Sequence, residues 1–236
     1  MGRVSRVLIT GSTDGLGLLA GQLLAADGHA VTLHARNAAR ADDARAALPA
    51  ADGVLVGDLS TIAGVRSVAD QAEDAGRFDA VVHNAAVGYQ ERRRVETADG
   101  LPLVLAVNVL APYLLTALMT SPARLVHLSS GMHRSGDPTP DDLLWTRRRW
   151  NGSQAYADSK LWDAVLSAAV ARRRSDVLAN SVDPGWVATR MGGPGASDDL
   201  AQGPVTQAWL AVSEDEEART SGGHWYHGAG ARPILR

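Results

Sequence analysis

The 236-residue chain contains no cysteine. Disulfide bonds, thiolate metal sites and cysteine nucleophiles are therefore excluded. The chain also lacks an apolar run long enough to cross a membrane, and its first residues, MGRVSRVLIT, lack the apolar segment of a secretory signal. We expect a cytoplasmic protein with no membrane partner.

A large excess of charge of either sign is absent as well. Lysine and arginine number 23, aspartate and glutamate number 26, and the formal net charge is −3. Binding to nucleic acid phosphates requires a cationic surface, so nucleic acid is excluded as the main partner. Three arginine triplets, at 92–94, 147–149 and 172–174, are interpreted as solvated helix ends and loops rather than as an anion site.

Short β-rich runs alternate with longer alanine-rich helical patterns along the chain. Several of these runs are almost continuously apolar, as in strands that are covered on both faces. This alternation predicts an α/β fold, with one doubly wound domain over 1–236 and helices on both faces of a parallel sheet. Strands are predicted at 6–10, 30–35, 53–57, 79–84, 123–130 and 177–183 and near the C-terminus, and helices near 15–26, 38–47, 61–75, 102–119, 154–173 and 198–212.

Two stretches interrupt the regular alternation. The connection at 131–153 is longer than compact domains usually carry, and 184–197 is rich in glycine and proline. Ligands of such sheets bind beyond the carboxyl ends of the strands. Both stretches are therefore predicted to form walls of a pocket.

A glycine-rich turn, TGSTDGLG at 10–17, follows the first predicted strand and opens the first predicted helix. Gly11, Gly15 and Gly17 would allow a tight turn and close approach of the backbone to a pyrophosphate. The helix N-terminus would add N–H groups and a partial positive charge. A plain strand–helix turn is the alternative, but the position of the motif in a βαβ unit favours a dinucleotide site.

The ends of the next three strands carry further candidates for cofactor contacts. Arg36 ends the second strand where a carboxylate would favour NAD, so NADP(H) is predicted, unless Arg36 is only a solvated charge. Asp58, after the third strand, could meet the adenine ring or cap the next helix. The fourth strand is followed by Asn84, Ala85 and Ala86, where small residues leave room for a flat cofactor and Asn84 could fix the turn beneath it.

Tyr156 and Lys160, in the segment AYADSK, fall one turn apart on a predicted helix. Residues i and i+4 share a helix face, so both side chains can point at one ligand. The ordinary pKa of tyrosine is about 10, and a nearby ammonium, together with the positive nicotinamide of an oxidised cofactor, would lower it. Tyr156 could then exchange a proton with a carbonyl or alcohol oxygen. Ordinary surface packing of the pair is the alternative.

These residues together resemble the short-chain dehydrogenase/reductase family over nearly the whole chain. The motifs that carry the resemblance are Thr10-Gly11-x-x-x-Gly15-x-Gly17, Asp58, Asn84-Ala85-Ala86-x-Gly88, Asn108, Ser130, Tyr156-x-x-x-Lys160 and Pro184-Gly185. The resemblance implies a Rossmann-like fold with a sheet of about seven strands. It also implies cofactor contacts from Gly11, Ser12, Thr13, Asp14, Gly15, Leu16, Gly17, Arg36, Asp58, Leu59, Asn84, Ala85, Ala86, Lys160, Pro184, Gly185, Val187 and Thr189.

The same resemblance implies a catalytic tetrad of Asn108, Ser130, Tyr156 and Lys160. Lys160 would hold the nicotinamide ribose, and Ser130 would donate a hydrogen bond to the substrate oxygen. Its neighbour Ser129 competes for that role, because strand alternation lets only one of the two face the pocket. Asn108 would anchor a water that links Lys160 to solvent, or alternatively its amide only bonds to backbone.

The segment between Ser130 and Tyr156 departs from the simplest members of the family. The two residues are 26 positions apart, about twice the usual separation, and the insertion resembles that of the subgroup related to retinol dehydrogenases. That resemblance implies an apolar or bulky carbonyl compound or alcohol as substrate. The predicted substrate contacts are His133, Trp145, Trp150, Trp186 and Met191.

The resulting hypothesis is an NADP(H)-dependent oxidoreductase that acts on a carbonyl or secondary alcohol, with a small molecule as its partner. Two alternatives remain: a cofactor-sensing regulatory protein, and an isomerase or dehydratase that uses the same tetrad. Relatives commonly form dimers or tetramers, so a homo-oligomer is a further expectation. His224 and His227 invite a metal site, but no third ligand is evident and none is predicted.

Overall fold

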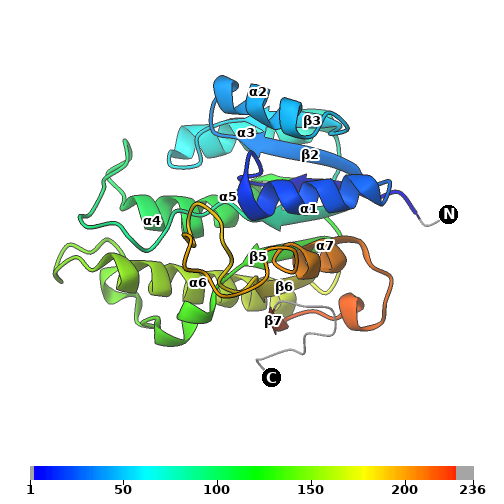
Figure 1. Ribbon diagram of the computed structural model, residues 1–236. Helices are drawn as coiled ribbons and strands as arrows, with labels where there is room; N and C mark the ends of the chain where they lie inside the picture. The colour runs from blue at the N-terminus through cyan, green and yellow to red at the C-terminus, as the bar shows by residue number, and fades with distance from the viewer. Residues whose placement is uncertain (1–2, 227–236) are drawn as a thin grey trace.

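A seven-stranded parallel sheet forms the centre of the protein (Figure 1). The structure is a computed structural model and describes residues 3–226. The strand order is β3-β2-β1-β4-β5-β6-β7, so the chain changes direction across the sheet between β1 and β4. The strands are β1 (Arg6–Ile9), β2 (Ala30–Ala35), β3 (Gly53–Val56), β4 (Ala80–His83), β5 (Arg124–Leu128), β6 (Leu178–Asp183) and β7 (His224–Tyr226).

Helices cover both faces of the sheet, as the sequence predicts. One apolar core joins the sheet to α1 (Gly15–Ala26), α2 (Ala38–Ala47) and α7 (Val205–Val212), with α1 and α7 side by side (Figure 1). A second core joins the opposite face to α3 (Ile62–Ala75), α5 (Ala111–Leu118) and α6 (Gly152–Arg173). The shorter elements are α4 (Leu103–Leu105), the π-helical turn η1 (Ala106–Leu110), and the 3₁₀ turns η2 (Gly131–Ser135), η3 (Pro140–Asp142) and η4 (Glu217–Arg219).

Polar residues mark the starts of three helices. The side chains of Asn37, Thr61 and Asn151 accept hydrogen bonds from backbone N–H groups three residues later, at the beginnings of α2, α3 and α6. Each cap satisfies a donor that has no partner within the helix. The alternative helix-cap role for Asp58 is therefore wrong, because Thr61 caps α3.

The predicted strands and most predicted helices are confirmed to within a few residues. The last predicted helix, at 198–212, is shorter: α7 begins at Val205. The preceding segment instead pairs with the 184–197 stretch, where Val187 and Asp198 form a parallel bridge. Within residues 3–226, no helix combines the length and the apolar character needed to span a bilayer.

A row of polar side chains crosses four neighbouring strands. His83 on β4 pairs in register with His127 on β5, His127 with Ser181 on β6, and Ser181 with His224 on β7. Residues in register share a face of the sheet. The two central rings, His83 and His127, lie 4.8 Å apart between centroids.

Candidate active site

The glycine turn after β1 is held from both neighbouring strands. The backbone N–H of Gly11 donates to Nδ1 of His34 on β2 at 3.0 Å. Gly11 and Gly15 have φ of +60° and +54°, a region that side chains rarely adopt. A β-carbon on Gly11 would lie 2.7 Å from the Cα of Ala85. Only glycine fits here, and the close backbone approach is the arrangement expected of a pyrophosphate-binding turn.

Asn84 fixes this turn from β4. Its amide nitrogen donates to the backbone oxygens of Thr10 and Gly11, each at 2.9 Å. The hydroxyl of Thr10 accepts in return from the backbone N–H groups of Asn84 and Ala85. The predicted support beneath a cofactor is therefore present in the hydrogen bonds of the protein.

Arg40, rather than the predicted Arg36, is the arginine of this region that contacts the glycine turn. Arg36 is exposed at the end of β2. Arg40, on the first turn of α2, donates to the hydroxyl of Thr13 and to the carboxylate of Asp14, both at 2.7 Å. Arg40 stands four residues after Arg36, and this proximity in the sequence is the feature that marks it as a second candidate for cofactor contact. Asp14 also lies 3.8 Å from Arg190 of the 184–197 stretch.

Asp58 and Leu59 follow β3 and have different surroundings. Asp58 is exposed, and its carboxylate accepts from the backbone N–H of Ser60 at 2.9 Å. The side chain of Leu59 is buried in the core beside α3. Leu59 can therefore contact a ligand only through its backbone, whereas the exposed carboxylate of Asp58 can contact one directly.

Asn108 lies in the π-helical turn η1 between α4 and α5. Its side chain exchanges two hydrogen bonds with the backbone of Val87 and donates to the hydroxyl of Ser159, next to Lys160. The amide thus ties the segment after β4 to α6. These contacts match the alternative in which the amide of Asn108 bonds to backbone, and its link to a water remains a prediction.

The two serines after β5 have separate environments. Ser129 is buried, and its hydroxyl donates to the backbone oxygen of Lys160 at 2.7 Å. Ser130 is only half-buried, and its hydroxyl is hydrogen-bonded to the side chain of Tyr156. The geometry therefore places Ser130, rather than Ser129, beside the phenol.

Tyr156 and Lys160 both point inward from α6, with exposures of 7% and 2%. Lys160 Nζ lies 5.7 Å from the centre of the Tyr156 ring. Burial raises the pKa of Tyr156 above its ordinary value, although Lys160 acts to lower it. The sequence-based expectation of a lowered pKa is therefore wrong for the chain itself, because loss of hydration outweighs the attraction of the ammonium.

The inserted segment 131–153 is folded around one carboxylate. Asp142 accepts hydrogen bonds from the backbone N–H groups of Thr146, Arg147 and Arg148. Burial would raise the pKa of Asp142, but these donors outweigh it and lower the pKa to about 2. Trp145, within this turn, takes the left-handed φ of +52°. Hydrogen bonds from the backbone to Asp142 therefore hold this part of the segment in a defined conformation.

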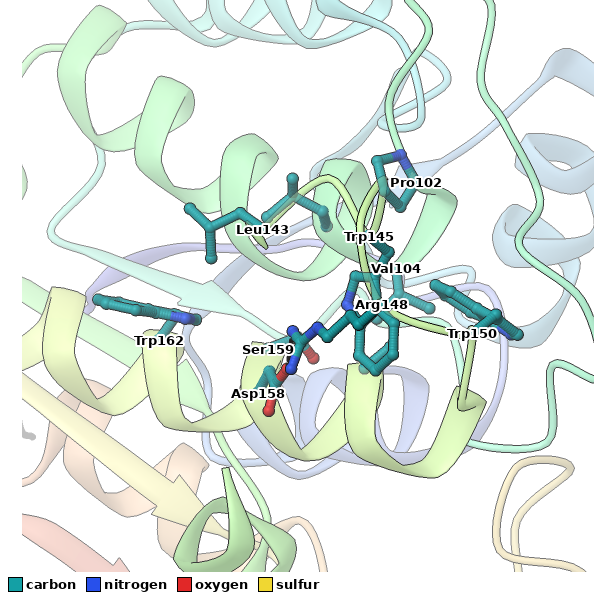
Figure 2. Close-up of a pocket in the computed structure, with 11 residues that line it drawn as sticks. Pro102, Val104, Leu143, Trp145, Arg148, Trp150, Asp158, Ser159 and Trp162 are labelled. Atoms are coloured by element: carbon teal, nitrogen blue, oxygen red, sulfur yellow. Dashed lines mark hydrogen bonds and ion pairs between the residues drawn. The ribbon is translucent and has the colours of Figure 1, made fainter. Parts of the chain in front are cut away.

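Trp145 and Trp150 belong to the inserted segment before α6 and line a cavity beside that helix (Figure 2). Their rings meet edge to face at 5.2 Å, and the Arg148 guanidinium stacks 3.7 Å from the Trp145 ring and pairs with Asp158. The cavity also contains Ser159 and Trp162, but Tyr156 and Lys160 are not among its lining residues. The structure thus does not bring these two tryptophans to Tyr156 and Lys160.

The other predicted substrate contacts are dispersed. His133 is buried, with Nδ1 2.6 Å from the backbone oxygen of Ser130 and its ring 4.3 Å from that of His224. Trp186 is 51% exposed on the 184–197 stretch. Met191 reaches Gly88, where a β-carbon would lie 3.1 Å from its side chain.

The 184–197 stretch packs against the glycine turn. Gly185, after Pro184, has φ of +82°, and its N–H donates to the carboxylate of Asp183. The Thr189 methyl lies 3.8 Å from the β-carbon position of Gly15. Val187 is buried, and its side chain approaches Gly203, which is also beside Leu16. The stretch therefore covers the glycine turn.

Tyr89 is a neighbour of the site that the sequence did not reveal. Its ring meets that of Tyr156 edge to face, with centroids 5.7 Å apart. Tyr89 belongs to the segment HNAAVGY, which follows β4. Its place just after the carboxyl end of a strand is the sequence feature that predicts a position near the site.

Metal ligands do not gather in the part of the chain that the structure describes. No group of three histidine, aspartate or glutamate side chains there could hold a metal ion. His224 instead bonds to Ser181 at 2.8 Å. His227, the second histidine of the pair considered in the sequence, lies outside the described residues.

The comparison with known proteins decides the family. A family described as "short chain dehydrogenase" matches residues 5–133, more than half of the chain. The chain belongs to the short chain dehydrogenase family. It is an oxidoreductase of this type, and proteins of this family bind a nicotinamide nucleotide.

Three curated relatives show the extent of the likeness. An uncharacterized oxidoreductase of Emericella nidulans is 43% identical over 95% of this chain and 87% of its own. A Streptomyces sp. (strain C5) protein, named provisionally as daunorubicin C-13 ketoreductase DnrU, is 36% identical over 92% of this chain and 81% of its own. Human retinol dehydrogenase 14 is 31% identical over 79% of this chain and 62% of its own.

Solved structures share the fold. An uncharacterized protein from Mycobacterium paratuberculosis superposes with a TM-score of 0.81 at 24% identity, over 100% of this chain and 90% of its own. A blue fluorescent protein from a metagenomic library, solved in complex with NADPH, superposes with a TM-score of 0.76 at 20% identity, over 94% of this chain and 95% of its own. These likenesses confirm the doubly wound architecture.

Proposed function

We propose that the protein uses NADP(H) to interconvert a carbonyl group and a secondary alcohol on an apolar or bulky small molecule. The observation that carries this proposal is the grouping of Ser130, Tyr156 and Lys160 at one edge of the sheet. Contacts connect this group to the glycine turn, from Gly11 through the segment after β4 to Asn108. A proton donor thus lies on the same edge as the dinucleotide cradle.

The chain's own residues supply the acid and the positioning. The bound cofactor would supply or accept hydride. Burial raises the pKa of Tyr156, so at neutral pH the phenol keeps its proton and can donate it to a carbonyl oxygen. Ser130 donates to the same oxygen as negative charge develops. Lys160 uses two N–H groups on protein acceptors, which leaves the third for the nicotinamide ribose.

The preference for NADP(H) rests on two arginines, Arg36 and Arg40, and on the absence of a carboxylate at the end of β2. Arg40 contacts the glycine turn, Arg36 is exposed at the end of β2, and β2 ends without the carboxylate that would bind a free ribose hydroxyl. Guanidinium groups bind phosphate oxygens with paired hydrogen bonds. A protein of the same fold holds NADPH, which agrees with this preference.

The substrate class rests on the side chains beside the phenol. Tyr89 lies against Tyr156, Met191 covers Gly88, and Trp186 is exposed on the same stretch as Met191. Tyr89 thus supplies an apolar surface beside the phenol, and Met191 supplies one beside the neighbouring residue Gly88. The names of two relatives, a ketoreductase and a retinol dehydrogenase, agree with carbonyl and alcohol chemistry.

The test is the loss of NADPH absorbance with a panel of apolar ketones. The wild-type protein should oxidise NADPH with at least one ketone, and Tyr156→Phe should abolish the signal while retaining NADPH binding. Normal turnover by this variant would remove the proton-donor assignment. NADPH binding without turnover of any ketone or alcohol would favour the cofactor-sensing alternative.

A further inference from the structure

Lys160 is held by a carboxylate as well as by the backbone. Its Nζ atom donates to the backbone oxygen of Leu128 at 2.6 Å and to Oδ2 of Asp163 at 2.9 Å. The side chains of Lys160 and Asp163 are 3% and 4% exposed. The ion pair therefore lies inside the protein, one turn along α6 from Tyr156.

Stability alone does not explain such a pair. The cost of removing two charges from water can exceed their attraction, and apolar residues of similar volume are often as stable. Asp163 also opposes the acidity of Tyr156, because its negative charge raises the pKa of the phenol. A carboxylate at this position therefore indicates a task at Lys160.

That task follows from the burial of the ammonium. Burial favours the neutral amine, and buried lysines can lose several pKa units. Burial acts in this direction on Lys160, but Asp163 and Tyr156 outweigh it, and the pKa of Lys160 is raised above its ordinary value. Asp163 thus keeps the amine charged, and the backbone oxygen of Leu128 holds it in place.

The other ionisable groups around the pair do not replace Asp163. His127 on β5 faces Lys160 and is followed by His83 on β4, and burial lowers the pKa of both, so they are neutral. Asp183, at the end of β6, is not hydrogen-bonded to Nζ. Within residues 3–226, Asp163 is the carboxylate that pairs with Lys160.

We propose that Asp163 is a positioning residue: it keeps the Lys160 ammonium charged and in place for the nicotinamide ribose, and the site works fully only while Asp163 is ionised. This inference rests on the proposed function. Asp163 acts through Lys160 rather than on the reacting atoms.

The ionisation of Asp163 falls within an accessible pH range. Burial raises its pKa to about 6, although Lys160 acts to lower it. Above this value the carboxylate is charged and the pair is intact. As the pH falls through about 6, Asp163 takes up a proton and the ammonium loses its counter-ion, so activity should fall.

The first test compares Asp163→Asn with Asp158→Asn, which removes a buried carboxylate of the same helix that pairs with Arg148. The constant kcat is measured from about pH 5 to pH 9 with NADPH and ketone saturating, so titration of the cofactor phosphate does not enter. The wild type and Asp158→Asn should lose activity as the pH falls through about 6. Asp163→Asn should lack this acid limb and have kcat lower by about tenfold near pH 7.5.

The second test needs no turnover. In the cofactor-free protein with carbon-13-labelled carboxyl groups, one NMR resonance should titrate near pH 6 and be absent from Asp163→Asn. The NADPH dissociation constant near pH 7.5 should rise about tenfold in Asp163→Asn and recover in Asp163→Glu. If Asp163→Asn does not fold, Asp163→Glu identifies the same resonance.

Three results would overturn the inference. They are an unchanged acid limb in Asp163→Asn, an unchanged NADPH affinity in that variant, or an Asp163 resonance that titrates near the ordinary value of about 4. Failure of the proposed function looks different. In that case the wild type itself neither binds nor oxidises NADPH, while the carboxyl titration still reports on the pair.

Discussion

Asn84 packs against Gly17 so closely that a β-carbon on Gly17 would collide with its side-chain amide nitrogen. The amide cannot withdraw, because it donates to the backbone oxygens of Thr10 and Gly11. Gly17→Ala should therefore open the turn, lower stability by about 1–3 kcal/mol and raise the NADPH dissociation constant at least about tenfold. Thermal unfolding and fluorescence titration measure the two effects.

Gly53→Ala is the matched control for this substitution. A β-carbon at Gly53 meets no atom within 4 Å, so stability should change by less than about 0.5 kcal/mol. Wild-type NADPH affinity in Gly17→Ala would contradict the assignment of the turn.

The two adjacent serines should separate chemistry from stability. Ser130→Ala removes the hydroxyl that bonds to Tyr156, and kcat should fall by about 10²–10³-fold with NADPH affinity retained. Ser129→Ala removes a bond to the Lys160 backbone and should cost about 1 kcal/mol of stability with a smaller effect on kcat. Steady-state kinetics and thermal unfolding of both variants check this, and the reverse pattern would assign the catalytic hydroxyl to Ser129.

Cofactor preference should depend on the two arginines near the glycine turn. Arg36→Gln and Arg40→Gln should each weaken NADPH binding by about tenfold and leave NADH binding almost unchanged, since only NADPH carries the 2′-phosphate. Arg45→Gln is the control, because Arg45 is an exposed residue of α2 paired with Asp42. Calorimetric titration with both cofactors tests the prediction, and equal losses for NADPH and NADH would refute it.

The buried histidines should make stability fall in acid. Burial lowers the pKa of His83 to about 3 and that of His224 to about 4. The unfolded chain binds protons near pH 6.5 and the folded chain does not, so unfolding is favoured as the pH falls below that value. His83 alone should cost about 2–3 kcal/mol between pH 7 and about pH 4.5. Asp163 acts in the opposite sense, because its pKa is raised.

Denaturant unfolding at the two pH values measures this loss. His83→Gln should reduce the difference between them, because an amide does not titrate. A free energy of unfolding that is the same at both values would show that these rings are hydrated.

The sequence predicts well what is set by local pattern. Apolar runs and glycine positions predict the strands and the turn after β1, whereas the grouping of Ser130 with Tyr156 is predicted by the family resemblance. What depends on contacts between distant segments was not accessible. The burial that raises the pKa of Tyr156 and the stacking of Trp145 on Arg148 both arise only when the insertion and α6 pack. The pairing of Asp163 with Lys160 is not predictable from the sequence, because a carboxylate on a helix usually faces solvent.

The π-helical turn at Ala106–Leu110 adds one residue to an otherwise α-helical segment. One extra residue rotates the helix by about 100° relative to a regular one. Val104 before the turn and Leu115 after it both face inward, and Asn108 does so between them. Deleting a single residue here would make the segment regularly α-helical and rotate the part before the turn relative to the part after it. The apolar residues and Asn108 could then no longer all face the interior of the protein.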